Sequence, residues 1–333
     1  MLLLSYQGTM SKLFYFIEPT GYNQYIAAAA NGSDCAMVFS GFGSKIEETL
    51  CKWHNAWPFN KHIELPFKQC WGRKYLSQIP SDCQYVLMAE SFRLSYSKSF
   101  LRNIRKHLPQ VKLCFVFSNP VGDYNLEKVK AMKESYDIII TFAKNDAEKN
   151  GIIYCDVLPF KLPDVDNEVD LESDIFYIGK EKGRLNQLLS VYEKAASLGL
   201  KCNFYITEVP EEKQKYADDI VYNHPIDYNE VLYHVQRSRC VLELLQDGCN
   251  YISIKTVEAL HYHKKLLTNN ASIINSNIYN KQYVRVINSV DDIDRPFITN
   301  DIPDEAFDTS SLVESYDPLI TYLDNYFMSN NNI

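Results

Sequence analysis

Residues 239–270 carry the pattern that most constrains how this chain can fold. An apolar run over residues 240–245 stops at a polar, glycine-containing loop of residues 246–253, and an amphipathic helical pattern starts near Ile254. A second apolar run follows at residues 265–268. Strand, loop, helix and strand in this order form the half-unit of a doubly wound parallel sheet, which binds ligands outside the carboxyl ends of its strands. The loop of residues 246–253 is therefore the first place to look for a binding site.

The helix after this loop begins with residues that suit a nucleotide. Ser253 is a candidate N-cap, and the backbone N–H groups at a helix start can bind phosphate. Lys255 adds a cation, and Glu258 adds a carboxylate that can accept hydrogen bonds from sugar hydroxyls. An ordinary structural reading stands beside this one, because the helix dipole favours an acid in the first turn and a lysine there is often only solvated. With Tyr251 in the loop, these residues predict a nucleotide site.

Four segments resemble a known family. SIKTVEAL (253–260), KKLLTNN (264–270) and DIFYIGKEKGRL (174–185) resemble the donor-binding half of GT-B glycosyltransferases, and the bacterial capsule and lipopolysaccharide transferases are the nearest likeness. YDIIITFAKNDAEKNGIIY (136–154) resembles the end of the amino-terminal domain in the same enzymes. The resemblance covers most of residues 110–270 and is weak over the first hundred residues.

The resemblance implies an α/β protein of GT-B type: two doubly wound, Rossmann-like domains that face each other across a cleft, with a C-terminal helix crossing back to the first domain. A glutamate at the position of Glu258 then holds the nucleotide ribose. The loop that faces the diphosphate contributes Gly179, Lys180, Lys182 and Arg184. Many retaining GT-B enzymes have two glutamates eight positions apart, but position 250 is Asn here, so the stereochemical class stays open.

The apolar pattern divides the chain into an acceptor-binding domain (1–164), a nucleotide-sugar-binding domain (165–312) and a crossover helix with tail (313–333). The first domain has near-continuous apolar runs, typical of strands covered on both faces. Prolines and acids interrupt the periodicity at residues 158–174. Residues 51–83 are expected to be irregular. The predicted strands of the first domain are 13–19, 35–42, 85–91, 111–120 and 136–142.

Charge and cysteine content bound the partners and the compartment. The net charge of -8 combines +4 over residues 1–164 with -12 over residues 165–333. A strongly acidic half disfavours nucleic acid as a partner. The nine cysteines form no C-x-x-C pair, which favours a reducing cytoplasm. The start of the sequence lacks the features of a signal peptide, Met10 is an alternative start, and no apolar stretch is long enough to span a membrane.

One basic segment stands out within the first domain. Residues 91–112 hold six Lys or Arg and no acidic residue. In a helix, Lys98, Arg102, Arg105 and Lys106 would lie opposite an apolar face, with no acidic neighbour to neutralise them. We expect this face to meet an anionic membrane surface or an acceptor, so the protein could be peripheral at the inner face of the plasma membrane. The ordinary alternative is a solvated helix face.

A transferase needs the acceptor hydroxyl deprotonated or polarised in the transition state. Glu18, Glu90 and Asp123 follow predicted strands of the first domain and are candidate bases. The sequences Asp-Val-Asp (164–166) and Asp-Ile-Asp (292–294) match a metal-binding D-x-D pattern, but neither follows an apolar strand. We therefore expect a metal-independent hexosyltransferase-like enzyme that uses a nucleotide sugar as co-substrate and no other cofactor.

The expected function is transfer of a sugar from a nucleotide-sugar donor to a glycan or lipid-linked acceptor in surface polysaccharide synthesis, as the resemblance implies. One alternative is a sugar-nucleotide epimerase of the same fold, which would form product without an acceptor. Another is a non-catalytic module, which would bind nucleotide sugar without turning it over. The sugar, the nucleotide and the acceptor cannot be read from the residues.

Overall fold

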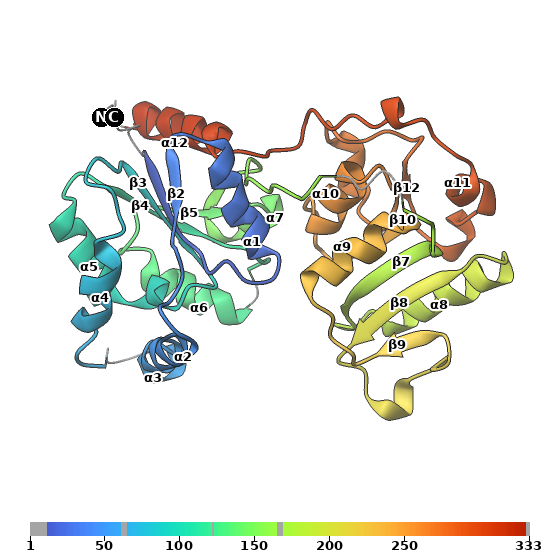
Figure 1. Ribbon diagram of the computed structural model, residues 1–333, viewed down its shortest axis with the longest axis horizontal. Helices are drawn as coiled ribbons and strands as arrows, with labels where there is room; N and C mark the ends of the chain where they lie inside the picture. Colours follow the sequence, from blue (N-terminus) through green and yellow to red (C-terminus); the bar gives the residue numbers. More distant parts are fainter. Residues whose placement is uncertain (1–11, 61–64, 122, 165–168, 331–333) are drawn as a thin grey trace, which may run out of the picture. The chain divides into compact units, whose positions relative to one another are not determined.

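The computed structural model describes residues 12–60, 65–121, 123–164 and 169–330. The chain divides into two compact units, the first formed by residues 1–161 and 313–333 and the second by residues 162–312. Each unit contains one parallel six-stranded sheet (Figure 1). The α/β class with two doubly wound, Rossmann-like units is therefore confirmed.

The sheet of the first unit has the order β2-β1-β3-β4-β5-β6, and every neighbouring pair is parallel. The strand order reverses between β1 and β3, because β2 pairs with one edge of β1 and β3 with the other. Its strands β1, β3 and β5 are buried along their whole length, as their apolar runs predict. The strands are β1 (Leu13–Phe16), β2 (Ala36–Val38), β3 (Tyr85–Ala89), β4 (Lys112–Val116), β5 (Ile138–Thr141) and β6 (Ile153–Tyr154).

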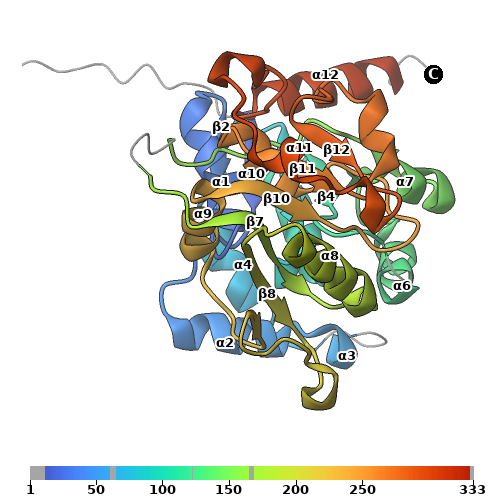
Figure 2. The ribbon, with the colours of Figure 1, turned by 90° about the vertical axis from the view of Figure 1, so that its right-hand side faces the viewer.

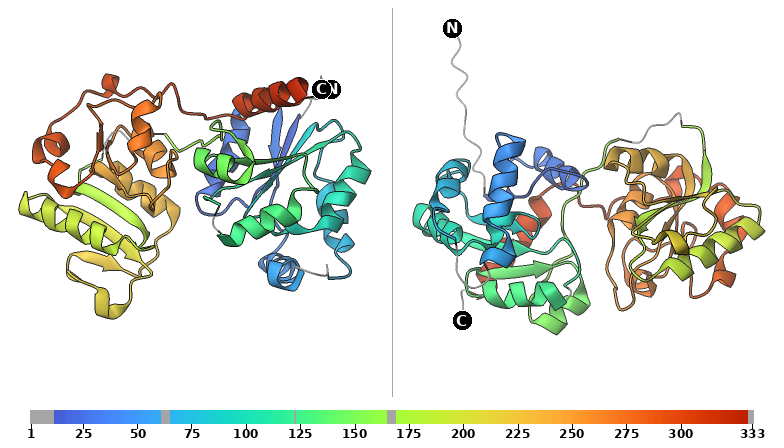
Figure 3. Two further views of the ribbon diagram at one scale, coloured as in Figure 1. Left: turned by 180° about the vertical axis from the view of Figure 1, so that it is seen from behind. Right: turned by 90° about the horizontal axis from the view of Figure 1, so that it is seen from below.

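The last helix, α12 (Asp317–Asn330), belongs to the first unit, as the resemblance predicts. It buries Leu319, Ile320 and Leu323 in the same apolar core as β1 and β3, and Asp324 accepts a hydrogen bond from the Tyr85 hydroxyl at 2.6 Å. Views from behind and below show it beside that unit (Figure 3). The other helices of the unit are α1 (Asn23–Ala28), α2 (Lys45–His54), α3 (Trp57–Asn60), α4 (Gln69–Leu76), α5 (Lys98–His107), α6 (Asp123–Met132) and α7 (Lys144–Asn150).

The sheet of the second unit has the order β12-β11-β10-β7-β8-β9, and again every pair is parallel. Helix α8 covers one face, and α9 and α10 cover the other (Figures 1 and 2). The strands are β7 (Ser173–Lys180), β8 (Cys202–Thr207), β9 (Ile220–Tyr222), β10 (Ser238–Glu243), β11 (Lys265–Thr268) and β12 (Val284–Val286). The helices are α8 (Leu185–Ser197), α9 (Tyr228–Gln236), α10 (Ile254–His261) and α11 (Arg295–Thr299).

Two local expectations are wrong. Residues 51–83 are not irregular, since they contain the end of α2 and all of α3 and α4. The helices that lie wholly within this range, α3 and α4, have only four and eight residues, which is too short for a helical period to stand out in the sequence. The second error concerns Gly179 and Lys180, which were expected in a loop. They are the last two residues of β7, because the sheet pairs them with Ile206 and Thr207 of β8.

Candidate nucleotide site and its surroundings

The strand order of the second sheet brings together the two loops that the sequence singles out. From β7 the chain moves to β8 and β9 on one side, and then to β10 on the other side of β7. At such a switch point the loops after the two central strands leave the carboxyl edge in opposite directions and open a crevice. These are the loops after β7 (residues 181–184) and after β10 (residues 244–253).

Arg184 fastens these two loops to each other. Its guanidinium donates to the carbonyl oxygens of Leu244, in the loop after β10, and of Lys180 (2.7 Å) and Glu181 (3.3 Å) at the end of β7. Sequence reasoning expected this cation to meet a diphosphate directly. In the structure its hydrogen bonds instead link the two loops of the switch point. This role depends on the folded positions of both loops, so the sequence does not show it.

Glu258 is the buried acid of this site. It lies in α10 with 2% of its surface exposed, and it accepts a hydrogen bond from the hydroxyl of Tyr228, the first residue of α9. Burial raises the pKa of Glu258 to about 7, and the nearby Lys255 ammonium and the Tyr228 hydroxyl only partly oppose this. A carboxyl group that titrates near neutrality at the carboxyl edge of a parallel sheet is a candidate for a functional site.

Lys255 places a positive charge beside that carboxyl group. Its ammonium lies 5.9 Å from the ring centroid of Tyr177 in β7. Burial lowers the pKa of Lys255, and Arg184 and Lys182 lower it further, whereas Glu258 raises it. An anion bound among these cations would relieve their mutual repulsion, so the site favours a phosphate group electrostatically.

Glu243 is a site residue that sequence reasoning missed. It ends β10 with 1% of its surface exposed, and its carboxylate accepts hydrogen bonds from the hydroxyls of Ser253, Thr256 and Thr268. The carboxylate therefore joins β10 to the start of α10 and to the end of β11. The sequence did hold a sign of this role, because Glu243 is a single acid within an apolar run. A buried strand tolerates an acid only when its carboxylate is well paired.

Ser253 serves as the predicted N-cap of α10, because its hydroxyl oxygen accepts a hydrogen bond from the Lys255 N–H at 3.1 Å. The same hydroxyl donates to Glu243. Its side chain thus holds the helix start in place, and the backbone of the first turn is the part suited to a phosphate. Tyr251 is half-buried, and its carbonyl accepts from Asn270 at 2.9 Å, which fixes the loop.

The remaining predicted donor residues lie along β7 and the turn after it. Lys180 is exposed and pairs with Glu208 at 2.5 Å, and exposed pairs of this kind contribute little to stability. Lys182 is exposed and adopts a left-handed backbone with φ of 41°. At Gly179 a Cβ atom would lie 2.9 Å from the Tyr177 hydroxyl, so the glycine makes room for that ring. Lys182 and Arg184 both lower the pKa of Lys255, whereas Lys180 pairs with Glu208, the residue that follows β8.

Two of the three candidate bases lie at the switch point of the first sheet. Glu18 follows β1 and Glu90 follows β3, the two strands between which the order reverses. Glu18 is 7% exposed, and its Oε2 pairs with Lys52 at 2.9 Å. Its Oε1 is buried and has no hydrogen-bond partner among the described residues. The charge of Glu90 contributes to the raised pKa of Tyr22, which burial mainly causes. Asp123 begins α6, and its side chain lies outside the described part.

Helix α5 has the buried face that its sequence predicts, since Phe100, Leu101, Ile104 and Leu108 are all buried. Lys98, Arg102 and Lys106 are exposed on its other side. The expectation that no acid neutralises this face is wrong for Arg105, which pairs with Asp137 at 3.1 Å. No helix in the described part of the chain is long and apolar enough to cross a membrane.

The D-x-D carboxylates have structural roles where they can be described. Asp292 accepts from the backbone N–H groups of Asn288 (2.8 Å) and Ser289 (3.0 Å). Asp294 caps α11 and pairs with Arg285. Asp164 is exposed, and Asp166 lies outside the described residues. Across residues 12–60, 65–121, 123–164 and 169–330, no three His, Cys, Asp or Glu side chains gather as metal ligands would.

A shallow pocket of about 340 Å³ opens at the opposite, amino-terminal edge of the second sheet, beside Lys265, Arg285 and Phe297. The Lys265 ammonium already donates to the carbonyl oxygens of Ile298 and Asn300. Since parallel sheets bind ligands at their carboxyl edge, the carboxyl edge at the switch point is the better candidate.

No protein family model matches this chain, and no curated protein matches its sequence. Among solved structures, TarM is 10% identical with a TM-score of 0.43 over 66% of this chain and 49% of its own, so this chain spans about half of it. An α-glucosyltransferase in complex with UDP-glucose and DNA is 12% identical with a TM-score of 0.46, covering 81% of this chain and 82% of its own. The UDP-GlcNAc 2-epimerase of Neisseria meningitidis, bound to UDP-GlcNAc, is 12% identical with a TM-score of 0.41, covering 94% and 92%. Similarities this distant say nothing about activity. The fold assignment is based on the two parallel six-stranded sheets.

Proposed function

We propose that the second unit binds a nucleotide sugar at its switch point, and that the protein transfers the sugar to an acceptor held by the first unit. The observation that carries this proposal is Glu258, a buried carboxyl group with a pKa of about 7 next to Lys255, at the edge where a doubly wound sheet binds its ligand. A ligand for this site needs hydroxyl groups for the carboxylate and negative charge for the cations. A nucleoside diphosphate has both.

In the proposed mechanism, the ribose hydroxyls donate to the Glu258 carboxylate, and the diphosphate meets the N–H groups at the start of α10. Lys255 and Lys182 neutralise the charge that builds up on the departing diphosphate. Arg184 and Glu243 keep the two loops in position for this purpose. These residues would supply the stabilisation that a metal ion gives in other transferases, so we propose metal-independent transfer.

The acceptor would be a glycan or a lipid-linked sugar of surface polysaccharide synthesis, as the sequence resemblance suggests. Glu18, which follows β1, is one candidate base, and one of its oxygens is buried and has no hydrogen-bond partner among the described residues. Glu90, at the neighbouring strand end, is the second candidate. The exposed cations Lys98, Arg102 and Lys106 would face an anionic membrane surface.

A thermal-shift screen with nucleotide sugars of different bases tests the proposal. We expect one of them to raise the Tm of the wild type and to have a much smaller effect on a Glu258→Gln variant. Glu208→Gln is the matched control, because Glu208 is exposed and only pairs with Lys180. If no nucleotide sugar raises the Tm, the proposed site is wrong. With a binding sugar in hand, product formed without an acceptor would indicate an epimerase, and binding without turnover would indicate a binding module.

A further inference from the structure

Helix α2 exposes its apolar side and turns its charged side inward. Ile46, Leu50 and Trp53 are 73%, 54% and 63% exposed, and their spacing places them on one face of the helix. The Trp53 ring contacts that of Phe59 from α3, with centroids 5.9 Å apart, and Phe59 is itself 55% exposed. Single exposed apolar residues are common, but a continuous apolar stripe marks an interaction surface.

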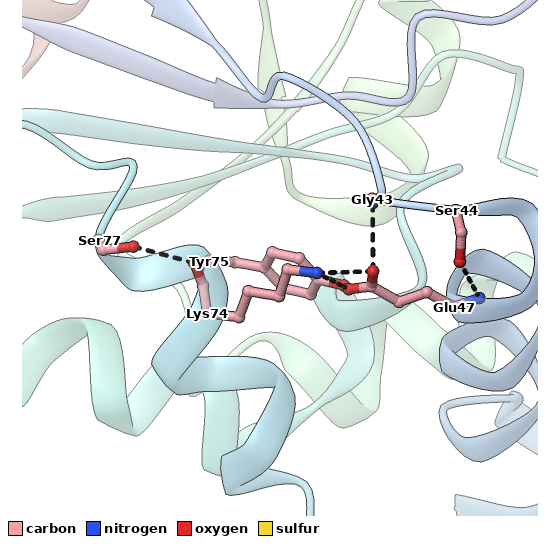
Figure 4. A network of polar contacts seen from close by, with 6 residues as sticks. All are labelled: Gly43, Ser44, Glu47, Lys74, Tyr75 and Ser77. Carbon is pink, nitrogen blue, oxygen red and sulfur yellow. Dashed lines mark hydrogen bonds and ion pairs between the residues drawn. The ribbon is translucent and has the colours of Figure 1, made fainter.

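The inward side of α2 is held by ionic contacts, so the helix cannot rotate to bury the stripe without breaking them. Glu47 accepts from the Lys74 ammonium at 2.6 Å and from the Tyr75 hydroxyl at 2.6 Å (Figure 4). One turn later, Lys52 pairs with Glu48 and with Glu18. Tyr75 is fully buried and Glu47 half-buried, so this network anchors α2 on α4.

A third exposed aromatic side chain lies two residues before α4. Phe67 is 72% exposed and adopts a left-handed backbone with φ of 64°, which a bulky residue rarely does without compensation. Trp71, four residues later, donates to the ring of His54 at 2.9 Å and so ties α4 to the end of α2. Figures 1 and 2 draw α2 and α3 at the edge of the first unit farthest from α12.

We propose that this surface, formed by Ile46, Leu50, Trp53 and Phe59, docks on the interface of an anionic lipid bilayer. Its side chains are those that amphipathic helices bury between headgroups and acyl chains. Charge complementarity supports the same occupant. Residues 44–60 and 65–77 hold two Glu and five Lys or Arg in a chain of net charge -8; of these cations, Lys45 and Lys74 are exposed and Lys68 is buried. Both of those glutamates are half-buried and paired, so no acid in these ranges is exposed.

The surface also offers few hydrogen-bonding groups to a protein partner. Thr49 is the polar residue within the stripe, and its hydroxyl donates back to the Lys45 carbonyl at 2.8 Å. The stripe thus offers few directional hydrogen bonds, whereas protein interfaces have about one for every 100–200 Å². Since Lys52 of the same helix pairs with Glu18, docking would also bring the candidate base close to the headgroups. The docking proposal itself does not depend on the transfer reaction.

Vesicle co-sedimentation tests this inference. The wild-type chain should bind phosphatidylcholine vesicles that contain about 30 mol% phosphatidylglycerol more tightly than pure phosphatidylcholine vesicles. An Ile46→Ser/Leu50→Ser/Trp53→Ser variant should lose at least about tenfold in partition coefficient, because it removes the apolar area that enters the interface. A Val221→Ser/Met328→Ser variant, also altered at exposed apolar positions, should bind like the wild type.

Tryptophan quenching by brominated lipids locates the contact. We expect the bilayer to quench wild-type fluorescence, and a Trp53→Phe variant to bind equally well with much less quenching. The proposal is overturned if the wild type does not bind, if the triple serine variant binds as well as the wild type, or if quenching persists without Trp53. A triple variant that turns a wild-type dimer into a monomer, with vesicle binding unchanged, would assign the surface to a second copy of the chain instead.

Discussion

The raised pKa of Glu258 makes opposite predictions for stability and for ligand binding in a Glu258→Gln variant. The pKa rises from 4.5 to about 7 on folding, mainly because burial disfavours the ionised form. The folded protein therefore keeps a proton that the unfolded chain loses. Relative to the glutamine variant, the wild type loses stability as the pH rises from about 4.5 to about 7, and the difference is constant above that.

A pKa difference of about 2.5 pH units corresponds to about 3–4 kcal/mol, at roughly 1.4 kcal/mol per unit. The variant should thus equal the wild type in stability near pH 4 and exceed it by up to about 3–4 kcal/mol near pH 8. All three tryptophans, at positions 53, 57 and 71, lie in the first unit. In urea unfolding, the added stability should shift the transition seen by circular dichroism, which reports both units. The transition seen by tryptophan fluorescence, which reports the first unit, should stay unchanged.

Nucleotide binding should change in the other direction. Ribose hydroxyls that donate to Glu258 favour its ionised form, so the affinity of the wild type should fall about tenfold for each pH unit below 7. The variant should bind more weakly above pH 7, by about 1.5–3 kcal/mol for a charge-assisted hydrogen bond, and with little pH dependence. Calorimetric titration with a nucleotide sugar measures both effects. Equal affinities in the two proteins, or equal stabilities near pH 8, would refute the reasoning.

The remaining predictions concern other parts of the two units. Thr256→Val should destabilise the second unit by about 1–3 kcal/mol, because it removes one of the hydroxyls that satisfy the buried Glu243 carboxylate, whereas Thr256→Ser should cost less; urea unfolding compares them. Sugar transfer should persist in excess EDTA, and activity that disappears and returns with magnesium or manganese would reopen the question of a metal. Glu18→Gln should lower kcat without changing donor affinity, and a variant with unchanged kcat would move the role of base to Glu90. A Lys98→Glu/Arg102→Glu/Lys106→Glu variant should lose salt-sensitive binding to anionic vesicles while it retains nucleotide binding, and equal vesicle binding would remove α5 from the membrane surface.

The strands and the position of Glu258 could be predicted because their signals are local. A buried parallel strand is a run of apolar residues, and a ligand-binding helix start follows such a run after a polar loop. The loop before α10 and the buried face of α5 both follow from this kind of pattern. Whether such a loop or helix face forms depends mainly on residues close to it along the chain.

Features that depend on distant residues could not be predicted in this way. Arg184 donates to a carbonyl 60 residues away, and Arg105 pairs with an acid 32 residues away. Glu243 reads as an interruption of an apolar run until Thr268, 25 residues later, is seen to donate to it. The inverted polarity of α2 likewise makes sense only when Lys74 and Tyr75 of α4 are placed against Glu47.

Hydrogen–deuterium exchange with a bound nucleotide sugar tests the central claim most directly, because it locates the ligand on the chain. The account predicts slower exchange in peptides that cover residues 179–187 and 244–258, the two loops of the switch point and the helix starts that follow them. It also predicts that Glu258→Gln weakens this protection at a given ligand concentration. Protection confined to the opposite edge of the sheet, around Lys265 and Arg285, would contradict the account.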